Sequence, residues 1–136
     1  MGSMGAADIV TAYLDALGGD DPDAVAAFVA ADFANEHFST LGSNSVGRDE
    51  YRRRLPGFME AFAGRHYEID AVVEQAIDDG TQVVARYRLT ATCDGVDIDV
   101  PGMMWLTVRH GEISRRIDCW DSLTFLDQTG LDQTGP

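Results

Sequence analysis

The sequence predicts a single α+β domain in which N-terminal helices pack into a curved antiparallel sheet. Apolar residues recur every three or four positions up to residue 63, and at every second position from residue 67 onward. Tight-turn signals at Asp78-Asp79-Gly80, Cys93-Asp94-Gly95 and His110-Gly111 then divide the second half into strands. Three helices followed by four strands indicate an α+β fold, since a parallel α/β sheet would alternate them.

The first two predicted helices are short and closely spaced. Residues 8–17 carry an apolar stripe at helical spacing, and Gly18-Gly19 ends the helix. Asp21 as N-cap and Pro22 at the first helical position then predict a second helix through residue 31.

An irregular connection and a third helix complete the first half. Residues 32–45 show no clear period, so we expect a connection without regular structure. Residues 49–63 return to steps of three and four and predict a helix that Gly64 closes. Pro56 lies inside this helix, which predicts a kink or a break there.

Period-two alternation predicts the four strands. They span residues 67–77, 82–92, 96–109 and 112 to about 125. A bulge is expected in the third of them at Pro101-Gly102, because proline cannot donate a ladder hydrogen bond.

The chain ends are assigned separately from the domain, which we expect to span residues 6–125. Residues 1–5 have the character of a cloning scar and a start, and residues 126–136 repeat LDQTG without apolar follow-up, which predicts a flexible tail.

The charge and residue composition of the chain argue against several classes of partner and binding site. The chain of 136 residues has a formal net charge of −13, which argues against nucleic acid and anionic membranes as partners. The two cysteines and three histidines have no metal or redox spacing, so no metal site is predicted. No membrane-spanning run and no signal peptide are visible, and we expect a cytoplasmic protein with reduced thiols.

Three segments resemble the nuclear transport factor 2-like superfamily, which includes ketosteroid isomerases, SnoaL-like polyketide cyclases and limonene epoxide hydrolases. They are the opening IVTAYLDALGGDDPDAVAAFVAADF, the hairpin VVARYRLTATCDGVDIDVPGMMWLTVRHGEI and the ending RRIDCWDSLTF. The resemblance implies a cone-shaped sheet wrapped around the helices and enclosing a pocket for a hydrophobic small molecule. It further implies no cofactor, and a homodimer formed through the convex face of the sheet.

The last strand carries the main candidate catalytic residues. Arg116, Asp118 and Trp120 share one face at period two, and the resemblance places Asp118 and Trp120 in the pocket. Asp118 would be the principal acid or base, while Arg116 would keep it ionised or bind a polar group of the substrate. The alternative is an ordinary surface Arg–Asp pair.

Further candidates lie in the first half and follow from the resemblance alone. Tyr13 matches an oxyanion-hole tyrosine of the isomerases, although a core aromatic is the simpler interpretation. Glu36 falls on the position of their proton-shuttling aspartate, and Asn35 and His37 lie beside it; a solvated loop is the alternative.

Two positions depart from the enzymes of the superfamily. The second oxyanion donor of the isomerases falls on Met103, and a thioether cannot donate a hydrogen bond. The Arg-x-Asp of the epoxide hydrolases is replaced by Arg88-Leu89-Thr90. A true ketosteroid isomerase is therefore unexpected, and the hydrolase interpretation is weakened.

The remaining predicted pocket residues are large and mostly apolar, as suits a bulky, flat ligand. They are Leu55, Phe58, Met59, Phe62, Tyr87, Leu89, Met103, Trp105 and Trp120, with Asn35 as a polar member.

Three functions stay open at this point. The first is a SnoaL-like enzyme that performs cyclisation, isomerisation or water addition without a cofactor. The others are a non-catalytic small-molecule-binding module and a dimerisation domain of the same fold.

Overall fold

The computed structural model describes residues 4–130 of the chain. Its helices are α1 (Ala6–Leu17), α2 (Pro22–Ala26), α3 (Arg48–Ala61) and α4 (Ser122–Thr129). Its strands are β1 (Val29–His37), β2 (Ser45–Val46), β3 (Ala63–Ile77), β4 (Gly80–Cys93), β5 (Val96–Arg109) and β6 (Glu112–Trp120).

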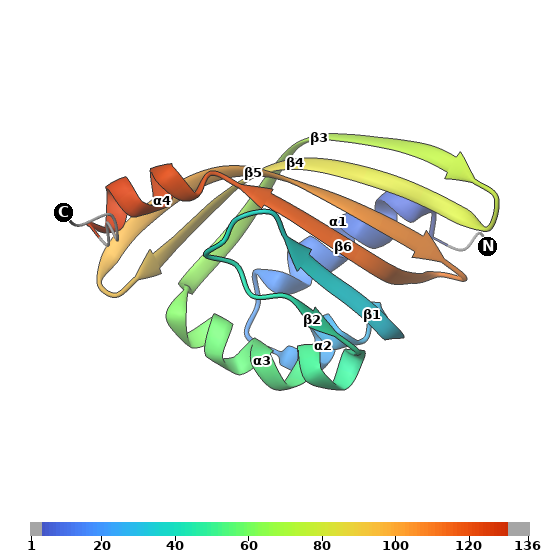
Figure 1. The fold of residues 1–136 in the computed structure, drawn as a ribbon, viewed down its shortest axis with the longest axis horizontal. Coiled ribbons are helices and arrows are strands. Elements are labelled where there is room, and N and C mark those ends of the chain that lie inside the picture. The colour runs from blue at the N-terminus through green and yellow to red at the C-terminus, as the bar shows by residue number, and fades with distance from the viewer. Residues whose placement is uncertain (1–3, 131–136) are drawn as a thin grey trace.

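The strands form one curved, open sheet in the order β2-β1-β6-β5-β4-β3. Figure 1 shows the sheet bending over α1 and α3, which lie on the same side of it, while α4 lies beyond the end of β6. The predicted α+β class with a curved sheet around N-terminal helices is confirmed. One pair of strands differs from the predicted antiparallel sheet, because β1 pairs with β6 in parallel while the other neighbouring strands are antiparallel.

Strand β1 replaces most of the predicted second helix and the irregular connection after it. Helix α2 ends at Ala26, and β1 begins at Val29. The prediction was wrong because β1 is held by β6, about eighty positions later in the chain, where Glu36 pairs with Ile117. Local periodicity carries no information about such a distant partner.

The two prolines expected to disturb regular structure do not interrupt it. Helix α3 continues through Pro56, which is exposed, so the carbonyl four residues earlier can bind water. Pro101-Gly102 lies in unbroken register with β4, and the irregularity of β5 falls instead between Thr107 and Val108, opposite β6.

The C-terminal segment turns into a helix rather than extending the last strand. Strand β6 ends at Trp120, and Asp121 caps α4 by accepting hydrogen bonds from the backbone and hydroxyl of Thr124. The expected flexible tail from residue 126 therefore begins inside α4. Residues 131–136 lie outside the described part of the chain, as do residues 1–3.

Two groups of buried side chains lie between the sheet and the helices. The larger joins α1 and α3 to the inner face of the sheet, and the smaller contains Ala91, Cys93, Ile98 and Val100 of the β4–β5 hairpin. Members of both groups line the cavity described below, which thus lies between them. None of the helices within residues 4–130 is long and apolar enough to cross a membrane.

Candidate active site

A pocket of about 630 Å³ opens between α3, α4 and the inner face of the sheet. Its volume is within the range of small-molecule sites. Most of the lining residues are apolar: Leu17, Leu41, Gly42, Leu55, Phe58, Phe62, Leu89, Ile98, Val100, Trp120, Phe125 and Leu126. The polar lining residues are Asn35, His37, Ser43, Tyr51, Arg54, Tyr67, Tyr87, Arg116 and Asp118.

A buried ion pair on β6 forms the polar floor of this pocket. Arg116 donates from Nη2 to Oδ2 of Asp118 at 2.7 Å. The two residues are 6% and 4% exposed, so the pair is almost fully desolvated. Both point to the inner face because β6 is in register with the buried Met104 and Leu106 of β5.

Tyr87 binds the second oxygen of the Asp118 carboxylate. Its hydroxyl donates to Oδ1 of Asp118 at 2.6 Å. Tyr87 pairs with Gly102 across β4 and β5, and a Cβ atom at Gly102 would lie 2.5 Å from the Tyr87 hydroxyl oxygen. The absence of a side chain at Gly102 is therefore what lets Tyr87 reach Asp118.

A chain of hydroxyl groups runs from Arg116 back toward the pocket. Arg116 Nη1 donates to the Tyr13 hydroxyl at 3.0 Å, and the hydroxyls of Tyr13 and Tyr51 are 2.5 Å apart. Tyr13 is fully buried behind the site, whereas Tyr51 lines the pocket. The arginine thus connects the carboxylate to a second polar group of the pocket wall.

Burial and charge fix the protonation of these groups. Burial raises the pKa of Tyr51 and of Tyr87, and the Asp118 charge raises that of Tyr87 further, so both stay protonated. Burial alone would lower the pKa of Arg116, but its interactions with Tyr13 and Asp118 outweigh burial and raise this pKa well above the ordinary value. The floor therefore combines a permanent cation with neutral phenols.

His37 lies beside the ion pair and is neutral near pH 7. Burial, followed by the nearby Arg116 charge, lowers the pKa of His37, while Asp118 opposes this shift. The Trp120 indole donates to Nδ1 of His37 at 3.3 Å, so this nitrogen is an acceptor and the proton of the neutral ring is on Nε2. His37 can thus donate one hydrogen bond from Nε2.

Two buried polar atoms of the floor have no hydrogen-bond partner within the described chain. They are Oδ1 of Asn35, an acceptor, and Nε of Arg116, a donor. The residues are direct neighbours across β1 and β6. Both atoms are buried, so a polar group of a bound molecule would reach them only if neighbouring side chains moved.

The structure brings most of the sequence-predicted residues to this pocket. Those that line it are Asn35, His37, Leu55, Phe58, Phe62, Tyr87, Leu89, Arg116, Asp118 and Trp120. Tyr13 and Met59 lie in the core rather than in the lining, Tyr13 touching the site through its hydroxyl. Asp118 is 4% exposed and lines the pocket, whereas a surface pair would be exposed; its chemical role remains a prediction.

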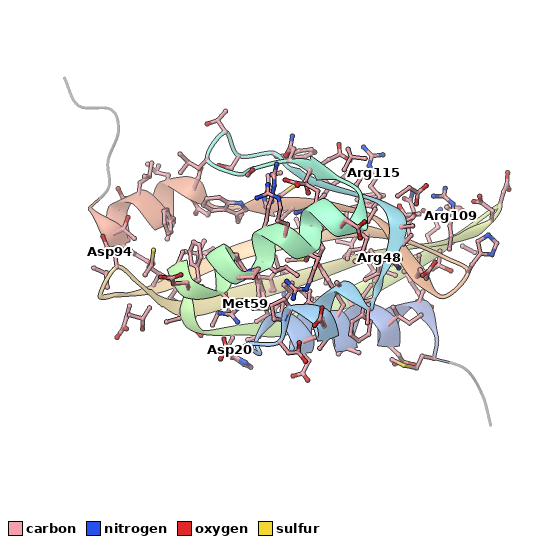
Figure 2. All side chains as sticks on the ribbon, turned by 90° about the horizontal axis from the view of Figure 1, so that it is seen from below. Asp20, Arg48, Met59, Asp94, Arg109 and Arg115 are labelled. Atoms are coloured by element: carbon pink, nitrogen blue, oxygen red, sulfur yellow. The ribbon has the colours of Figure 1, made fainter. Side chains whose placement is uncertain are left out.

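Three predicted placements are wrong. Glu36 points away from the pocket and forms an ion pair with Arg115, whose side chain Figure 2 shows at the edge of the molecule. The reason is alternation, since Asn35 and His37 on either side of it face inward. Met103 and Trp105 are 49% and 46% exposed on the outer face, because Met104 and Leu106 occupy the inner one.

Several lining residues were not identified from the sequence. Tyr51 and Tyr67 appeared only as members of apolar patterns, and their inward hydroxyls had no signature of their own. Arg54 belongs to a run of three arginines that is typical of a solvated helix face. Within residues 4–130, no cluster of three or more His, Cys, Asp or Glu side chains could hold a metal ion.

Comparison of whole folds places the chain among known cone-shaped domains. A protein of ketosteroid isomerase-like fold from Catenulispora acidiphila, solved with trimethylamine, superimposes with a TM-score of 0.81 at 22% identity, over 98% of this chain and 99% of that one. An epoxide hydrolase from M. tuberculosis resembling limonene epoxide hydrolase gives a TM-score of 0.74 at 20% identity, over 90% and 87% of the two chains. A candidate polyketide cyclase from Pseudomonas putida gives 0.74 at 17% identity, over 93% and 98%.

Sequence comparison identifies the family. No curated protein matches the chain. The model of the SnoaL-like domain matches residues 10–116, which include most of α1, most of the sheet and Arg116 of the pocket floor, and which end two residues before Asp118. The chain therefore belongs to the SnoaL-like domain family of the nuclear transport factor 2-like superfamily.

Proposed function

We propose that this protein is a cofactor-independent enzyme that moves a proton on a hydrophobic small molecule, with Asp118 as the base. The observation that carries the proposal is the buried Arg116–Asp118 pair at the floor of an otherwise apolar pocket. A desolvated ion pair contributes little to stability compared with apolar packing, so its presence in such a pocket favours a chemical role.

The proposed step is removal of a proton from a carbon next to a carbonyl group. Asp118 forms an ion pair with Arg116 at 2.7 Å, and a carboxylate is the form that a base needs. The C–H electron pair moves into the enolate, and the proton passes to Asp118. Return of the proton to another carbon gives isomerisation, whereas attack of the enolate on a second carbonyl gives cyclisation.

The enolate oxygen needs hydrogen-bond donors, and the pocket wall offers three. Tyr51 can donate if Tyr13, which receives the Arg116 hydrogen, passes its own hydrogen to Tyr51. Tyr67 lines the pocket, and its hydroxyl has no partner among residues 4–130. His37 can donate from Nε2. One donor aimed at a developing oxyanion contributes roughly 3–4 kcal/mol to catalysis.

Proton transfer is favoured over epoxide hydrolysis because the lining contains a single carboxylate. Asp118 is the only acidic residue among the lining residues, and Glu36 is turned away. Arg88 and Thr90, at the positions of the hydrolases' second pair, are exposed. Water addition would then lack the second carboxylate that the epoxide hydrolases use.

The test is exchange of carbon-bound hydrogen for deuterium in an enolisable ketone such as 2-tetralone, followed by NMR in D₂O. We expect the wild-type protein to accelerate exchange and Asp118→Asn to lose at least a hundredfold of that acceleration. Asp99→Asn is the matched control, because Asp99 is an exposed carboxylate that also pairs with an arginine, Arg88. Equal exchange in Asp118→Asn and wild type would overturn the proposal.

A binding module without catalysis is the second candidate. It is favoured by the engagement of both oxygens of Asp118, one by Tyr87 and one by Arg116. In that case Asp118 would only hold the pocket wall in place. Ligand binding without proton exchange in any enolisable ketone would support this alternative.

We also propose that two copies associate through the outer face of the sheet. The apolar outer patch, formed by Val84, Met103, Trp105, Ile117 and Cys119, lies on three adjacent strands. Ion pairs of Arg86 with Asp70 and of Arg88 with Asp99 border it. An apolar centre with a polar rim is typical of a protein interface.

A further inference from the structure

Arg54 is the cation at the open side of the pocket. It lines the cavity from α3, one turn before Phe58 and directly before Leu55, and its side chain is 39% exposed. The other arginine of the lining, Arg116, is at the buried floor and is neutralised by Asp118. The pocket lining thus contains two arginines, one paired at the buried floor and one partly exposed on α3.

The guanidinium of Arg54 is held in place by Glu50, Asn44 and Ser43, of which Ser43 also lines the pocket. Nε donates to Oε2 of Glu50 at 2.6 Å. Nη1 donates to the Ser43 hydroxyl at 2.7 Å and to the Asn44 carbonyl at 3.0 Å. Nη2 has no partner among residues 4–130. A tethered guanidinium with one free nitrogen loses little side-chain entropy when it binds a further acceptor.

The local charge at this position is positive although Glu50 is nearby. Glu50 is shared, since Arg53 also donates to both of its oxygens. Hydrogen bonds from Arg53 and Arg54 lower the pKa of Glu50 to about 2, so it is a carboxylate at neutral pH. Two arginines and one carboxylate leave one net positive charge, in a protein whose overall net charge is −13. The net negative charge of the molecule repels an anionic ligand, whereas the local positive charge at Arg53 and Arg54 would attract it.

The aromatic residues of the lining suit a flat ring system. Phe58 and Phe62 lie with ring centroids 5.3 Å apart, and Phe125 of α4 continues the row 6.1 Å from Phe62. Trp120 meets Phe125 edge-on at 5.7 Å. Such a row of aromatic side chains packs well against the faces and edges of an aryl ligand.

We infer that the ligand of this pocket is an aromatic or otherwise flat apolar molecule bearing a carboxylate, and that Arg54 Nη2 binds this carboxylate at the pocket mouth. The inference rests on the proposed ligand site and names the class of molecule that enters it. Arg54 is then a residue that determines specificity, whereas Asp118 acts on the carbon that loses the proton.

The experiment compares two probes of the same shape, 2-naphthoate and 2-naphthamide, by calorimetric titration at pH 7.5 and low salt. We expect wild-type protein to bind 2-naphthoate about tenfold more tightly than 2-naphthamide, as one charged hydrogen bond provides. Arg54→Gln should remove that preference and leave binding of 2-naphthamide unchanged, which shows that the pocket itself is intact. The preference of the wild-type protein should also decrease with added salt.

Arg52→Gln is the matched control. Arg52 is another arginine of α3, pairs with Asp23 rather than with Glu50, and is not part of the lining, so its removal leaves the charges of Glu50, Arg53 and Arg54 unchanged. It should keep the tenfold preference. The inference is overturned if Arg54→Gln retains the preference, which would assign the carboxylate to Arg116, or if the wild-type protein shows no preference or binds neither probe. Deuterium exchange by the Asp118 pair is measured separately, so the proposed function can stand when this inference fails.

Discussion

At the scale of single residues, the contact between Gly102 and Tyr87 decides the geometry of the proposed base. A Cβ atom at position 102 would lie 2.5 Å from the Tyr87 hydroxyl oxygen and 2.6 Å from its Cζ atom. The ring would have to move, and with it the 2.6 Å hydrogen bond to Asp118. Gly102 is thus part of the site although it carries no functional group.

We therefore expect Gly102→Ala to resemble Tyr87→Phe in its effect. Each should lower the free energy of unfolding by about 1–3 kcal/mol, through crowding in one case and a lost hydrogen bond to a carboxylate in the other. Because both act through the same hydrogen bond, the double variant should be less destabilised than the sum of the two. Urea unfolding of the four proteins measures this, and strict additivity would contradict it.

His37 gives the site a defined pH dependence. Its pKa lies below the ordinary value of 6.5 in the folded protein, chiefly because of burial and then because of Arg116. Below pH 6.5 the unfolded chain therefore binds the proton more readily than the folded one. The contribution of neutral His37 to stability is complete above pH 6.5 and decreases as the pH falls below it.

The expected result is that wild-type protein loses more stability between pH 7.5 and pH 5.5 than His37→Gln does. Glutamine keeps an acceptor for the Trp120 indole but cannot titrate. Urea unfolding at pH 7.5 and pH 5.5 gives the loss in the free energy of unfolding for each protein. Titration of the carboxylates contributes equally to the two losses. Equal losses would mean that burial of His37 does not disfavour its charged form.

At the scale of elements, a single buried arginine joins the helices to the sheet. The side chain of Arg65, at the start of β3, is 0% exposed. It donates to carbonyl groups at the ends of α1 and α3 and to one carboxylate: Leu17, Gly19, Asp20, Met59 and Phe62. Figure 2 labels Asp20 and Met59, which lie near each other at the two helix ends that Arg65 connects.

Replacement of Arg65 by methionine should therefore be strongly destabilising. The carbonyl groups at two helix ends would lose their donors inside the protein, and we expect a loss of about 3–5 kcal/mol in the free energy of unfolding. Arg86→Met is the control, because Arg86 forms one exposed ion pair with Asp70 and should cost less than about 1 kcal/mol. Similar losses in the two variants would mean that the helix ends find other partners.

The elements also show how far the sequence could predict this structure. Turn residues and the change of period located the hairpins of β3 to β6, because both signals are local, whereas the pocket residues followed from the resemblance to the superfamily. The inward face of β5 was assigned wrongly, since Met103, Met104, Trp105 and Leu106 are all apolar and alternation gives no preference. The inward face of β5 is identified only by the pairing of Met104 with the inward-pointing Asp118 of β6. Strand β1 and the inward Tyr51 likewise depend on contacts between distant parts of the chain.

At the scale of the whole molecule, the wrong assignment of the inward face of β5 and the exposure of the apolar outer patch have the same cause. A strand that is apolar on both faces has two surfaces to bury, the pocket side and the outer side. The inner side is covered by the helices, as Figure 1 shows, and the outer patch around Met103 and Trp105 remains exposed in a single chain. A second copy related by two-fold symmetry would cover it with the same patch.

We expect the protein to be a dimer at micromolar concentration and Trp105→Glu to be a monomer, since a carboxylate at the centre of the patch would be desolvated without a partner. Sedimentation velocity over a hundredfold range of concentration measures this. Leu123→Glu is the control, because Leu123 is also an exposed apolar side chain but lies on α4, away from the patch.

Each copy carries a net charge of −13, so the two copies repel each other. Added salt screens this repulsion and should therefore strengthen the dimer. A wild-type monomer, or a Trp105→Glu dimer, would show that the outer patch is not the interface, and a dimer weakened by salt would point to contacts between opposite charges instead.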